Sequence, residues 1–429
     1  MTGEHEHRHE LYPMLSVEDA LDHVLSAFGP LEPERIPILQ TLGRVLAEDV
    51  YAEVNIPPHA NSAMDGYAVI AADAVDAGPE APVRLRVIEN LAAGYVAQQE
   101  VAPGTAIRIM TGAPIPQGAD AVIRFERTAD AGQEGEWVDL YYAPPVGNNI
   151  RYAGEDVRRG DLILGKGTRI RPQEVGMLAS LGCSEVSVIR RPRVAILATG
   201  DELVDVDEPL GPGKIRNSNG YSNVAQVLKY GGVPIMLGIA RDKVNDLTDK
   251  IRSGLAQGAD LLLTSGGVSV GDFDVVKKVL AGEGEITFWR VRMKPGKPLA
   301  FGKITAEVNG VTRTVPVLGM PGNPVSVMVS FEIFARPAIL TMLGLEDTEK
   351  PMVEAVLEDE IPSKDERRHY VRVRIDRRED GYHASLTGAQ GSGILTSMVK
   401  ANAFAVIPED WTHAPAGSRV KVMFFDEQP

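Results

Sequence analysis

The stretch TSGGVSVGDFD, residues 264–274, decides the fold of this chain. It directly follows a short apolar run of three leucines, residues 261–263, which comes after a polar stretch of helical character over 244–257. This order is typical of a central parallel strand in an α/β domain. The glycines then fall at the carboxyl end of the strand, where open α/β sheets bind their ligands. The segment therefore predicts an α/β domain with a ligand site at that edge.

The side chains of this turn indicate what the ligand is. Gly266 and Gly267 let an anion approach the backbone N–H groups, and Ser269 adds a hydroxyl donor. Asp272 and Asp274 would repel a bare phosphate unless a divalent metal lay between them and the phosphate. The pattern favours a metal-assisted phosphate site. A tight turn followed by a capped helix is the purely structural alternative.

Two segments rich in proline and glycine lie downstream. MKPGKP, residues 293–298, holds Lys294 and Lys297 between prolines that lower the cost of ordering them. Rigid lysines beside a phosphate loop suit a dianionic ligand. GMPGNPVS, residues 319–326, predicts a rigid turn that opens a helix.

The α/β domain is predicted to span residues 193–345, because strand and helix patterns alternate there as in a parallel sheet. Right-handed crossovers place the carboxyl ends of such strands at one edge. We expect that edge to gather Glu202, Asp242 and Asp274 near one metal-bound phosphate. The expected strands are 194–198, 234–239 and 260–263, and the expected helices are 219–230, 244–257 and 275–280.

Three other domains are predicted. Residues 14–54 together with 147–192 read as an elongated helical and linker domain, with helices at 16–28, 35–50 and 172–181. Short alternating runs make 55–146 a β-rich inserted domain. Short strands such as 371–375 and 404–408 predict a small β-barrel over 350–429.

Composition excludes several classes of protein. A net charge of −15 over 429 residues argues against a nucleic-acid partner. No apolar run approaches the length of a membrane span, and the start MTGEHEHRHE lacks the apolar core of a signal peptide, so a cytoplasmic location is expected. The single cysteine, Cys183, excludes an internal disulfide. His5, His7 and His9 fit a solvated leader better than a metal site.

Further motifs carry a family resemblance. NSAMDGYAV (61–69), IMTGAPIPQGADAV (109–122), NIRYAGED (149–156) and TGDEL (199–203) occur in order with the segments above. Together they resemble the molybdopterin molybdenumtransferase family, which includes the bacterial MoeA-type enzymes and the E domain of gephyrin. The resemblance runs from about residue 15 to the C-terminus.

The resemblance implies an enzyme of molybdenum cofactor biosynthesis. Such an enzyme inserts molybdate into adenylylated molybdopterin, with Mg²⁺-dependent hydrolysis and release of AMP. It implies a homodimer in which the α/β domain of one subunit faces the β-rich domain of the other. A molybdopterin adenylyltransferase as donor and molybdoenzymes as acceptors are the expected partners.

The resemblance also assigns residues to roles. It implies catalytic roles for Asp65 and Thr111, acting in trans, and for Lys294 and Lys297. The carboxylates that it implies as catalytic metal ligands are Glu202, Asp242 and Asp274. The residues that it implies for substrate binding are Ser265, Gly266, Gly267, Ser269, Asp272 and Pro298, with Arg372, Ser392 and Ser397 for molybdate.

The chain departs from the family pattern at two positions. Arg290 stands where members often carry lysine, and a guanidinium differs in geometry from an ammonium. His369 stands where an acidic residue is common, which makes the expected molybdate pocket more positive. Within NIRYAGED, we favour a structural ion pair between Arg151 and Asp156 over a direct role in catalysis.

Three alternatives stay open from sequence. The α/β core also resembles the enzymes that adenylylate molybdopterin, and a fold does not settle which half-reaction is run. A non-enzymatic scaffold like gephyrin is the second alternative. Insertion of tungstate in place of molybdate is the third, because the two oxyanions have nearly the same size and charge.

Overall fold

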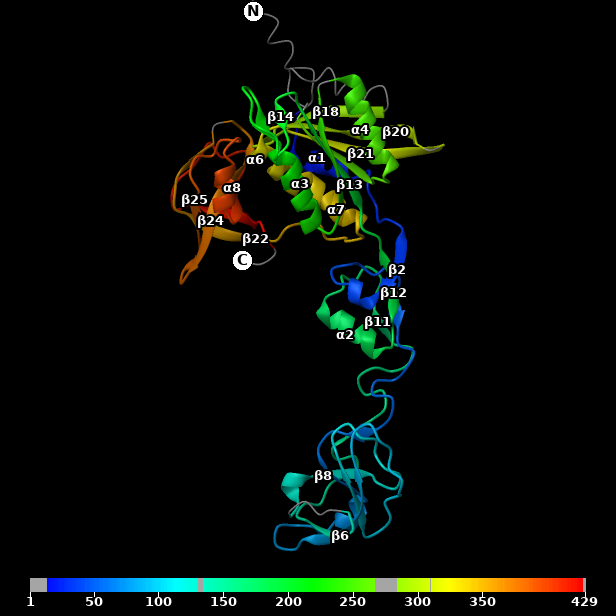
Figure 1. The fold of residues 1–429 in the computed structure, drawn as a ribbon. Helices are drawn as coiled ribbons and strands as arrows, with labels where there is room; N and C mark the ends of the chain where they lie inside the picture. Colours follow the sequence, from blue (N-terminus) through cyan, green and yellow to red (C-terminus); the bar gives the residue numbers. More distant parts are fainter. Residues whose placement is uncertain are drawn as a thin grey trace, which may run out of the picture. The chain divides into compact units, whose positions relative to one another are not determined.

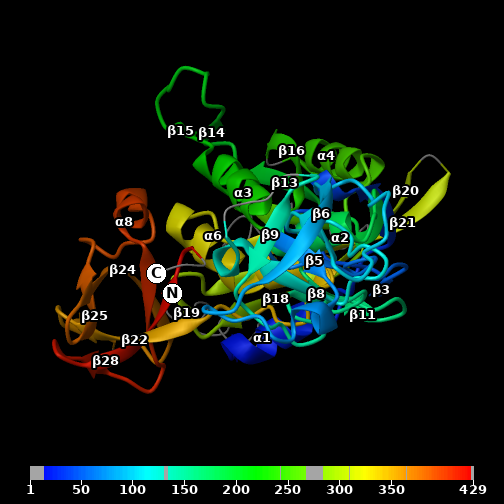
Figure 2. The same cartoon turned by 90° about the horizontal axis from the view of Figure 1, so that it is seen from below.

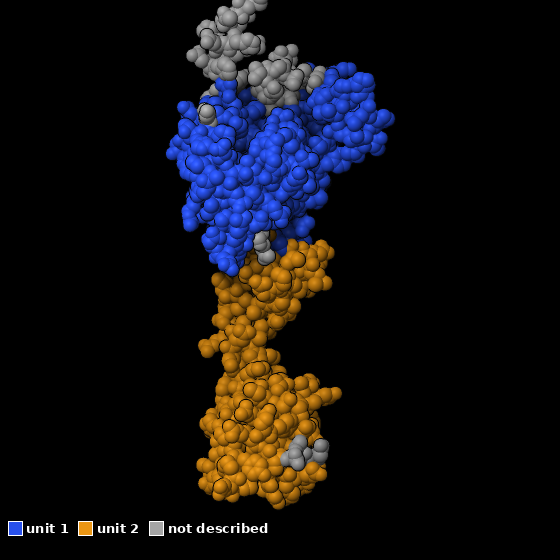
Figure 3. All heavy atoms as spheres, turned by 90° about the vertical axis from the view of Figure 1, so that its left-hand side faces the viewer, with its two compact units in different colours: residues 1–36, 43–47, 187–429 blue, residues 37–42, 48–186 orange. Residues whose placement is uncertain are grey.

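The structure is a computed structural model that describes residues 14–129, 134–241, 243–266, 284–308, 310–363 and 365–426. The chain divides into two compact units (Figure 3). Unit 1 comprises Met1–Ile36, Gly43–Ala47 and Ser187–Pro429, and unit 2 comprises Pro37–Leu42 and Glu48–Val186. We describe each unit by itself.

Unit 1 contains a seven-stranded sheet (Figure 1). Its parallel half consists of β21, β17, β13 and β16, and the other half adds β20 and β18 in antiparallel pairs and then β1. In sheet order the strands are β1 (Met14–Leu15), β18 (Gly284–Val291), β20 (Pro298–Val308), β21 (Val311–Met320), β17 (Leu261–Ser265), β13 (Arg193–Thr199) and β16 (Val233–Ala240).

The predicted parallel strands are confirmed, but the prediction of a purely parallel sheet is incomplete. It missed β18, β20 and β21. The last two pair over most of their length, from Ala300↔Gly319 to Val308↔Val311. The Asn-Gly dipeptide at 309–310 between them is a strong hairpin signal in the sequence. The lysine segment 293–298 therefore leads directly into a sheet strand.

Both faces of this sheet are covered. Val194, Ile196 and Leu261 belong to one apolar core, which also includes residues of α1, α3, α6 and α7. Ala195 and Leu262 point the other way, into a core with α4, because side chains of a strand alternate between faces. The helices are α1 (Val17–Leu25), α3 (Ser218–Lys229), α4 (Val244–Ala256), α6 (Pro324–Ser330) and α7 (Arg336–Met342).

A five-stranded barrel completes unit 1 and confirms the predicted C-terminal barrel. Its strands pair in the order β24, β25, β22, β28, β26, and pairing of β26 with β24 closes it. Helices α3 and α6 lie between the sheet and the barrel (Figure 2). The elements are β22 (Met352–Leu357), β24 (Arg368–Arg378), β25 (Gly381–Leu386), α8 (Leu395–Lys400), β26 (Ala403–Ile407) and β28 (Arg419–Phe424).

Unit 2 is built mainly of strands, as predicted for 55–146. Its largest sheet has five strands, with Gly66–Val69 at a central position. In sheet order these are β8 (Ala121–Arg124), β5 (Gly66–Val69), β7 (Thr105–Ile109), β6 (Val83–Leu91) and β9 (Trp137–Leu140). The other elements are β3 (Val50–Tyr51) with β11 (Leu162–Leu164), β4 (Asn61–Ser62) with β10 (Ile150–Arg151), η2 (Ala71–Ala74), η3 (Phe125–Arg127) and α2 (Pro172–Ser180).

The remaining short elements lie where the chain passes between the units or follows a longer strand. They are β2 (Pro33–Pro37), η1 (Ile38–Gln40), β12 (Glu185–Ile189), β14 (Leu203–Val204), β15 (Ile215–Arg216), β19 (Met293–Lys294), β23 (Ile361–Pro362) and β27 (His413–Ala414).

One predicted helix is wrong. Residues 35–50 contain part of β2 and the single 3-10 turn η1. Pro37 has no N–H to donate within a helix, and Gly43 has a φ of 76°, which ends any helical continuation. The helix predicted at 16–28 does form, as α1, and Ser16 accepts the N–H of Asp19 at its start.

Helix α1 does not pack as the sequence grouping expects. That grouping placed 14–54 with 147–192, but Val17, Ala20 and Val24 form an apolar stripe that joins the core of unit 1. Burial of this stripe against α7 and the π-helical turn η4 (Phe331–Ala335) fixes the segment there. The division into four domains otherwise stays a prediction.

The longest apolar helix is interrupted by charge. Residues Pro324–Met342 run through α6, η4 and α7, and they are long and apolar enough to cross a membrane. This corrects the expectation that no apolar run approaches that length. However, 78% of its most apolar 18-residue stretch is buried inside the protein, as in a core helix. Two charged residues, Glu332 and Arg336, interrupt it.

Glu332 is the centre of a buried polar network. Lys350 donates to it at 2.7 Å, Tyr230 donates its hydroxyl at 2.8 Å, and Gln226 donates at 3.1 Å. Lys350 also donates to the carbonyls of Phe424 and Phe425 at the end of β28. The network thus ties the last barrel strand to α3 and η4.

Substitution of Lys350 by methionine should destabilise unit 1. The change leaves Glu332 without its closest cation, and removing one partner of a buried ion pair costs about 3 kcal/mol or more. We expect the free energy of unfolding, measured with urea, to fall by roughly that amount. Lys421→Met, at an exposed lysine of β28, is the control and should change it by about 0.5 kcal/mol or less. Equal effects of the two changes would contradict the prediction.

Candidate active site

The predicted phosphate edge is formed by the carboxyl ends of β13, β17 and β21. The backbone N–H of Gly266 donates to the carbonyl of Met320 at 3.2 Å, and Thr199 donates its hydroxyl to the carbonyl of Ser265 at 3.4 Å. The hydroxyl oxygen of Ser265 is buried and has no hydrogen-bond partner among the described residues. Such an atom costs free energy unless a ligand or water reaches it. The edge therefore holds an unused polar atom where the sequence predicts a ligand.

Gly266 is required by close backbone contact. Its φ is +91°, and a Cβ atom there would lie 2.5 Å from the carbonyl oxygen of Thr199. This explains the first glycine of the deciding stretch. Gly267, Ser269, Asp272 and Asp274 lie outside the described residues, as does Asp242.

Glu202 lies at the same edge, just after β13. A Cβ atom on Gly200 would come within 2.4 Å of the Glu202 carboxylate, so this carboxylate packs over the Gly200 backbone. Arg241, which follows β16, donates to the backbone carbonyls of Asp201 and Leu203. The structure thus brings the segments after β13 and β16 together, as predicted. Within the described ranges, no group of three or more His, Cys, Asp or Glu forms a metal site.

The two predicted lysines lie in a second cluster, at the junction of the sheet and the barrel. Strand β19 pairs in parallel with the start of β24, so that Lys294 lies opposite His369. The ammonium of Lys294 donates to Asp365 at 3.0 Å. Pro298 begins β20, opposite Arg290 of β18. The expectation of a rigid lysine segment agrees with this placement between two strands.

Lys297 lies among other cations. Desolvation, followed by the nearby charges of Arg290 and Arg367, lowers the pKa of Lys297, and Asp365 opposes the shift. A bound anion would offset the repulsion between such a lysine and the neighbouring cations. The lowered pKa therefore indicates a position that favours anion binding.

The predicted molybdate residues form a third cluster on the outer side of the barrel wall, where β24 meets α8, because Val371 and Val373 fill the barrel core and Arg372 between them points the other way. Arg372 of β24 is 1% exposed. It donates to the hydroxyl of Ser397 at 3.0 Å and to the carbonyl of Gly391 at 3.1 Å. Burial lowers the pKa of Arg372 to about 10. No carboxylate in the part of the chain that the structure describes contacts this guanidinium, so its charge has no counter-ion there.

A chain of contacts links the barrel to the phosphate edge. The carbonyl of Ser392 accepts the N–H of Val325, the second residue of α6. The preceding loop reaches back, because Asn219 of α3 donates to the carbonyl of Gly322 at 2.7 Å. A Cβ atom on Gly322 would lie 3.6 Å from the Cα of Gly266. The predicted segment 319–326 therefore lies between two of the clusters.

In unit 2 the structure brings Asp65 and Thr111 together. Both the N–H and the hydroxyl of Thr111 donate to the same carboxylate oxygen of Asp65, at 2.6 and 2.8 Å. The backbone bond and then the hydroxyl bond lower the pKa of Asp65, which keeps it ionised. Gly66 packs so tightly that a Cβ atom would lie 2.0 Å from the carbonyl oxygen of Ile123.

NIRYAGED lies next to this pair. Strand β10 pairs with β4, so that Arg151 faces Asn61. The predicted ion pair between Arg151 and Asp156 does not form. Glu155 instead accepts the N–H of Tyr152 at 2.8 Å, which closes the turn locally.

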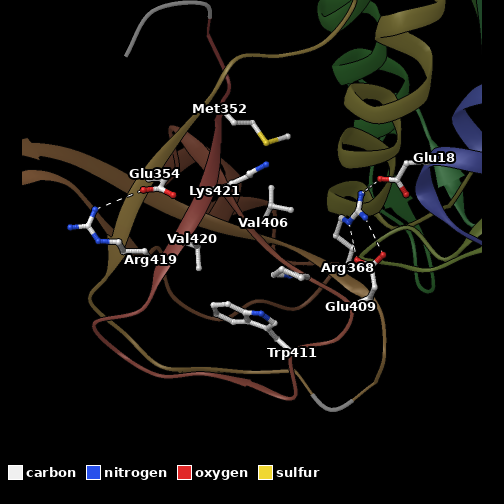
Figure 4. A pocket seen from close by; sticks show the side chains of 11 residues that line it. Glu18, Met352, Glu354, Arg368, Val406, Glu409, Trp411, Arg419, Val420 and Lys421 are labelled. Carbon is white, nitrogen blue, oxygen red and sulfur yellow. Dashed lines mark hydrogen bonds and ion pairs between the residues drawn. The ribbon is translucent and has the colours of Figure 1, made fainter.

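Unit 1 also contains a cavity of about 450 Å³ beside the barrel, lined in part by Trp411, Met352 and Lys421 (Figure 4). At one end Arg368 pairs with Glu18 of α1 and with Glu409 at 3.0 Å. None of the predicted site residues lines this cavity. It therefore lies apart from the three clusters of unit 1.

Comparison with known proteins agrees with this arrangement along the whole chain. Family models match the MoeA N-terminal region (domain I and II) at residues 15–182, the probable molybdopterin binding domain at 195–341 and the MoeA C-terminal region (domain IV) at 354–425. The chain belongs to the MoeA family. The predicted family is thus confirmed.

Relatives of this MoeA-family chain cover nearly its full length. A molybdopterin molybdenumtransferase of Bacillus subtilis is 36% identical, over 96% of this chain and 95% of its own. Molybdopterin molybdenumtransferase 2 of Mycobacterium tuberculosis is 37% identical, over 95% and 99%. A crystal structure of a molybdopterin biosynthesis MoeA protein from Pyrococcus horikoshii OT3 has a TM-score of 0.78 and 34% identity, over 96% of this chain and all of that one.

Sequence reasoning missed the acidic member of the lysine cluster. Asp365 contacts Lys294, Arg367 and His369, yet it lies in the mixed-charge run KDERRH, residues 364–369, which resembles a solvated turn. Only the pairing of β19 with β24 reveals its position. Gln390, which accepts the backbone N–H of Arg372, was missed in the same way.

Gly266→Ala should destabilise the phosphate edge. An alanine there needs a positive φ and a Cβ inside the contact distance of the Thr199 carbonyl, and such strain costs about 1–3 kcal/mol. Gly322→Ala is the matched control, because its Cβ would meet only ordinary contacts. Urea unfolding should separate the two variants by at least about 1 kcal/mol. The interpretation of Gly266 is wrong if they are equally stable.

Proposed function

We propose that this chain is a molybdopterin molybdenumtransferase that inserts molybdate into adenylylated molybdopterin, with Mg²⁺-dependent hydrolysis and release of AMP. The observation that carries the proposal is Arg372, a buried guanidinium with no described carboxylate partner, hydrogen-bonded to Ser397. Molybdate is a dianion that such a group would neutralise. The relatives named molybdopterin molybdenumtransferase, which match nearly the whole chain, support the same activity.

The residues of unit 1 suit the two anionic substrates in different ways. Arg372 and Ser397, with Ser392 nearby, would hold molybdate by hydrogen bonds directed from a fixed strand and helix. Lys294 and Lys297 would bind the phosphates of the pterin substrate and stabilise charge that develops as the anhydride is broken. The hydroxyl of Ser265, which has no partner among the described residues, would donate to the phosphates of the pterin substrate at the sheet edge.

Mg²⁺ fits the chemistry of the predicted donors. Glu202, Asp242 and Asp274 supply only carboxylate oxygens, the ligand type that Mg²⁺ prefers. When bound, the ion would neutralise phosphate charge and polarise the anhydride. The position of the Glu202 carboxylate just after β13 supports this proposed role.

A barrel with an oxyanion site favours insertion over the alternatives. Adenylylation of molybdopterin needs no site for molybdate, and a scaffold needs neither a buried unpaired guanidinium nor a cluster of lysines. Tungstate would satisfy Arg372 equally well, because its charge and size are nearly those of molybdate. We propose molybdate on the basis of the relatives' names.

The assembly and setting of the enzyme are part of the proposal. We propose a cytoplasmic homodimer in which Asp65 and Thr111 of one subunit act on the substrate held by the other. A molybdopterin adenylyltransferase would supply the substrate, and molybdoenzymes would accept the product.

The proposal is tested by measuring AMP release and activation of a cofactor-free molybdoenzyme with adenylylated molybdopterin, molybdate and Mg²⁺. Arg372→Gln should raise the molybdate concentration for half-maximal rate about 10- to 100-fold, since a charge-assisted hydrogen bond is lost. Arg374→Gln, in the same strand but exposed, is the matched control and should leave it unchanged. Molybdate-independent AMP release by the unmodified enzyme would refute molybdate insertion.

Complementation between subunits tests the action of Asp65 in trans. Asp65→Asn and Lys294→Gln homodimers should each be nearly inactive. If the two residues serve one site from different subunits, mixed dimers contain one intact site, and random exchange restores about a quarter of the normal rate. Mixing that restores no activity, with exchange between a ¹⁵N-labelled and an unlabelled variant verified by native mass spectrometry, would place both residues in the same subunit.

A further inference from the structure

Asp365 is surrounded by three donors from two different segments. Lys294 of β19 donates to its Oδ2 at 3.0 Å, and Arg367 donates to the same oxygen at 2.5 Å. Nε2 of His369 lies 2.7 Å from Oδ1. Since a carboxylate only accepts, Nε2 carries the proton in this contact. One carboxylate thus accepts hydrogen bonds from a lysine, an arginine and an imidazole.

His369 is placed behind this carboxylate, away from solvent. It is 5% exposed, and its cross-strand partner on β26 is the apolar Ile407. The charged groups that face it are Asp365, Lys294 and Arg367, and the hydroxyl of Ser363 lies 3.4 Å from Nε2. Lys294, in contrast, is about half exposed at its side chain. The cluster therefore has a buried, titratable end and an open, cationic end.

We infer that Asp365 is a positioning residue that holds the Lys294 ammonium in place, and that the charge of buried His369 sets how strongly it does so. The inference rests on the proposed function, in which Lys294 binds the phosphates of the substrate. When His369 is neutral, the negative charge of Asp365 is balanced by Lys294 and Arg367. A protonated His369 takes a share of that charge and repels Lys294, which favours contact of Lys294 with a bound anion.

The electrostatics of the cluster agree with this geometry. Burial would raise the pKa of Asp365, but its bonds from Arg367, His369 and Lys294 outweigh it and keep the carboxylate ionised. Desolvation lowers the pKa of His369, and Lys294 and Arg367 act in the same direction, while Asp365 opposes them. The neutral form of His369 therefore predominates at neutral pH, and the switch operates as the pH falls below the ordinary value of 6.5.

Linkage gives the same cluster an effect on stability. Because the pKa of His369 is lower in the folded than in the unfolded chain, its contribution to stability is fully present above about pH 6.5. That contribution is lost as the pH falls through the folded pKa. His369→Gln should remove this part of the pH dependence of unfolding.

The first test is an NMR titration of the full chain with ¹³C-labelled histidine. The resonance of His369 is identified as the one missing from His369→Gln. We expect its midpoint to lie below 6.5, to fall further in Asp365→Asn, and to rise in Lys294→Gln, which removes a like charge. Lys421→Gln is the control and should leave it unchanged. A midpoint that is the same in the Asp365 and Lys294 variants as in the unmodified chain would overturn the inference.

The second test measures anion binding without turnover. Sulfate is the probe, because it stays doubly charged over the range in which a phosphate ester titrates. By calorimetry at low ionic strength, the unmodified protein should bind sulfate about two- to fivefold more tightly near pH 5.5 than near pH 8. His369→Gln should lose this gain, and Lys294→Gln should weaken binding at both values. A full gain retained in His369→Gln would refute the switch.

The two proposals fail separately. Molybdate-dependent AMP release without any coupling between His369 and Lys294 would leave the function intact and remove the positioning role. Coupling and sulfate binding without molybdate-dependent turnover would keep the role of Asp365 and remove molybdenum insertion. Because Lys294 is exposed, its variant should fold, so the NMR comparison holds even if Asp365→Asn does not.

Discussion

The hydrogen bonding of strand β24 is the constraint on which the rest of unit 1 depends. This one strand pairs with β25 and β26 to close the barrel, and its first residues pair with β19, which leads into the main sheet. It carries His369 at the junction and Arg372 on the outer side of the barrel wall, against α8. Residues of a strand alternate between faces, so these two side chains point to opposite sides. A single element therefore sets the register of the lysine cluster and of the Arg372–Ser397 pair.

Charge is distributed unevenly between these clusters and the rest of the molecule. The chain has a net charge of −15, yet the groups predicted to contact substrate are Lys294, Lys297 and Arg372. Acidic partners neutralise several of the other arginines, as in the pairs Arg190–Asp260 and Arg171–Glu174. A chain of net negative charge whose predicted substrate-binding groups are cationic suits small anions better than long polyanions.

Sequence reasoning succeeded where a local pattern determines the structure. The leucine run before TSGGVSVGDFD predicted β17, and the helical pattern at 16–28 predicted α1. It failed where the decisive partner is distant in sequence. Strands β20 and β21 are amphipathic, and the sequence alone does not distinguish them from loops. Only their pairing with each other shows that they are strands. The sequence pattern of residues 35–50 has the periodicity of a helix, but Pro37 prevents a helix from forming there.

The site could be predicted to the same extent. Asp65 and Thr111 were expected together and are hydrogen-bonded, and Arg372 with Ser397 was expected to bind an oxyanion and forms a bonded pair. Asp365 could not be found, because nothing local distinguishes it from other acids in a charged turn. Its role depends on a parallel pairing between segments about 70 residues apart, which no spacing rule anticipates.

The packing of Gly66 changes how the string NSAMDGYAV should be interpreted. A Cβ atom there would lie 2.0 Å from a backbone oxygen of the neighbouring strand, so the position excludes every side chain for steric reasons alone. Asp65, directly before it, instead uses its side chain, whose carboxylate accepts two hydrogen bonds from Thr111. In a saturation mutagenesis experiment the two positions would look equally intolerant. Under the catalytic role proposed for Asp65, chaperone supply or lowered temperature would not rescue replacements there, whereas partial rescue at Gly66 would identify a folding defect. Two adjacent letters of one signature would then meet separate physical requirements.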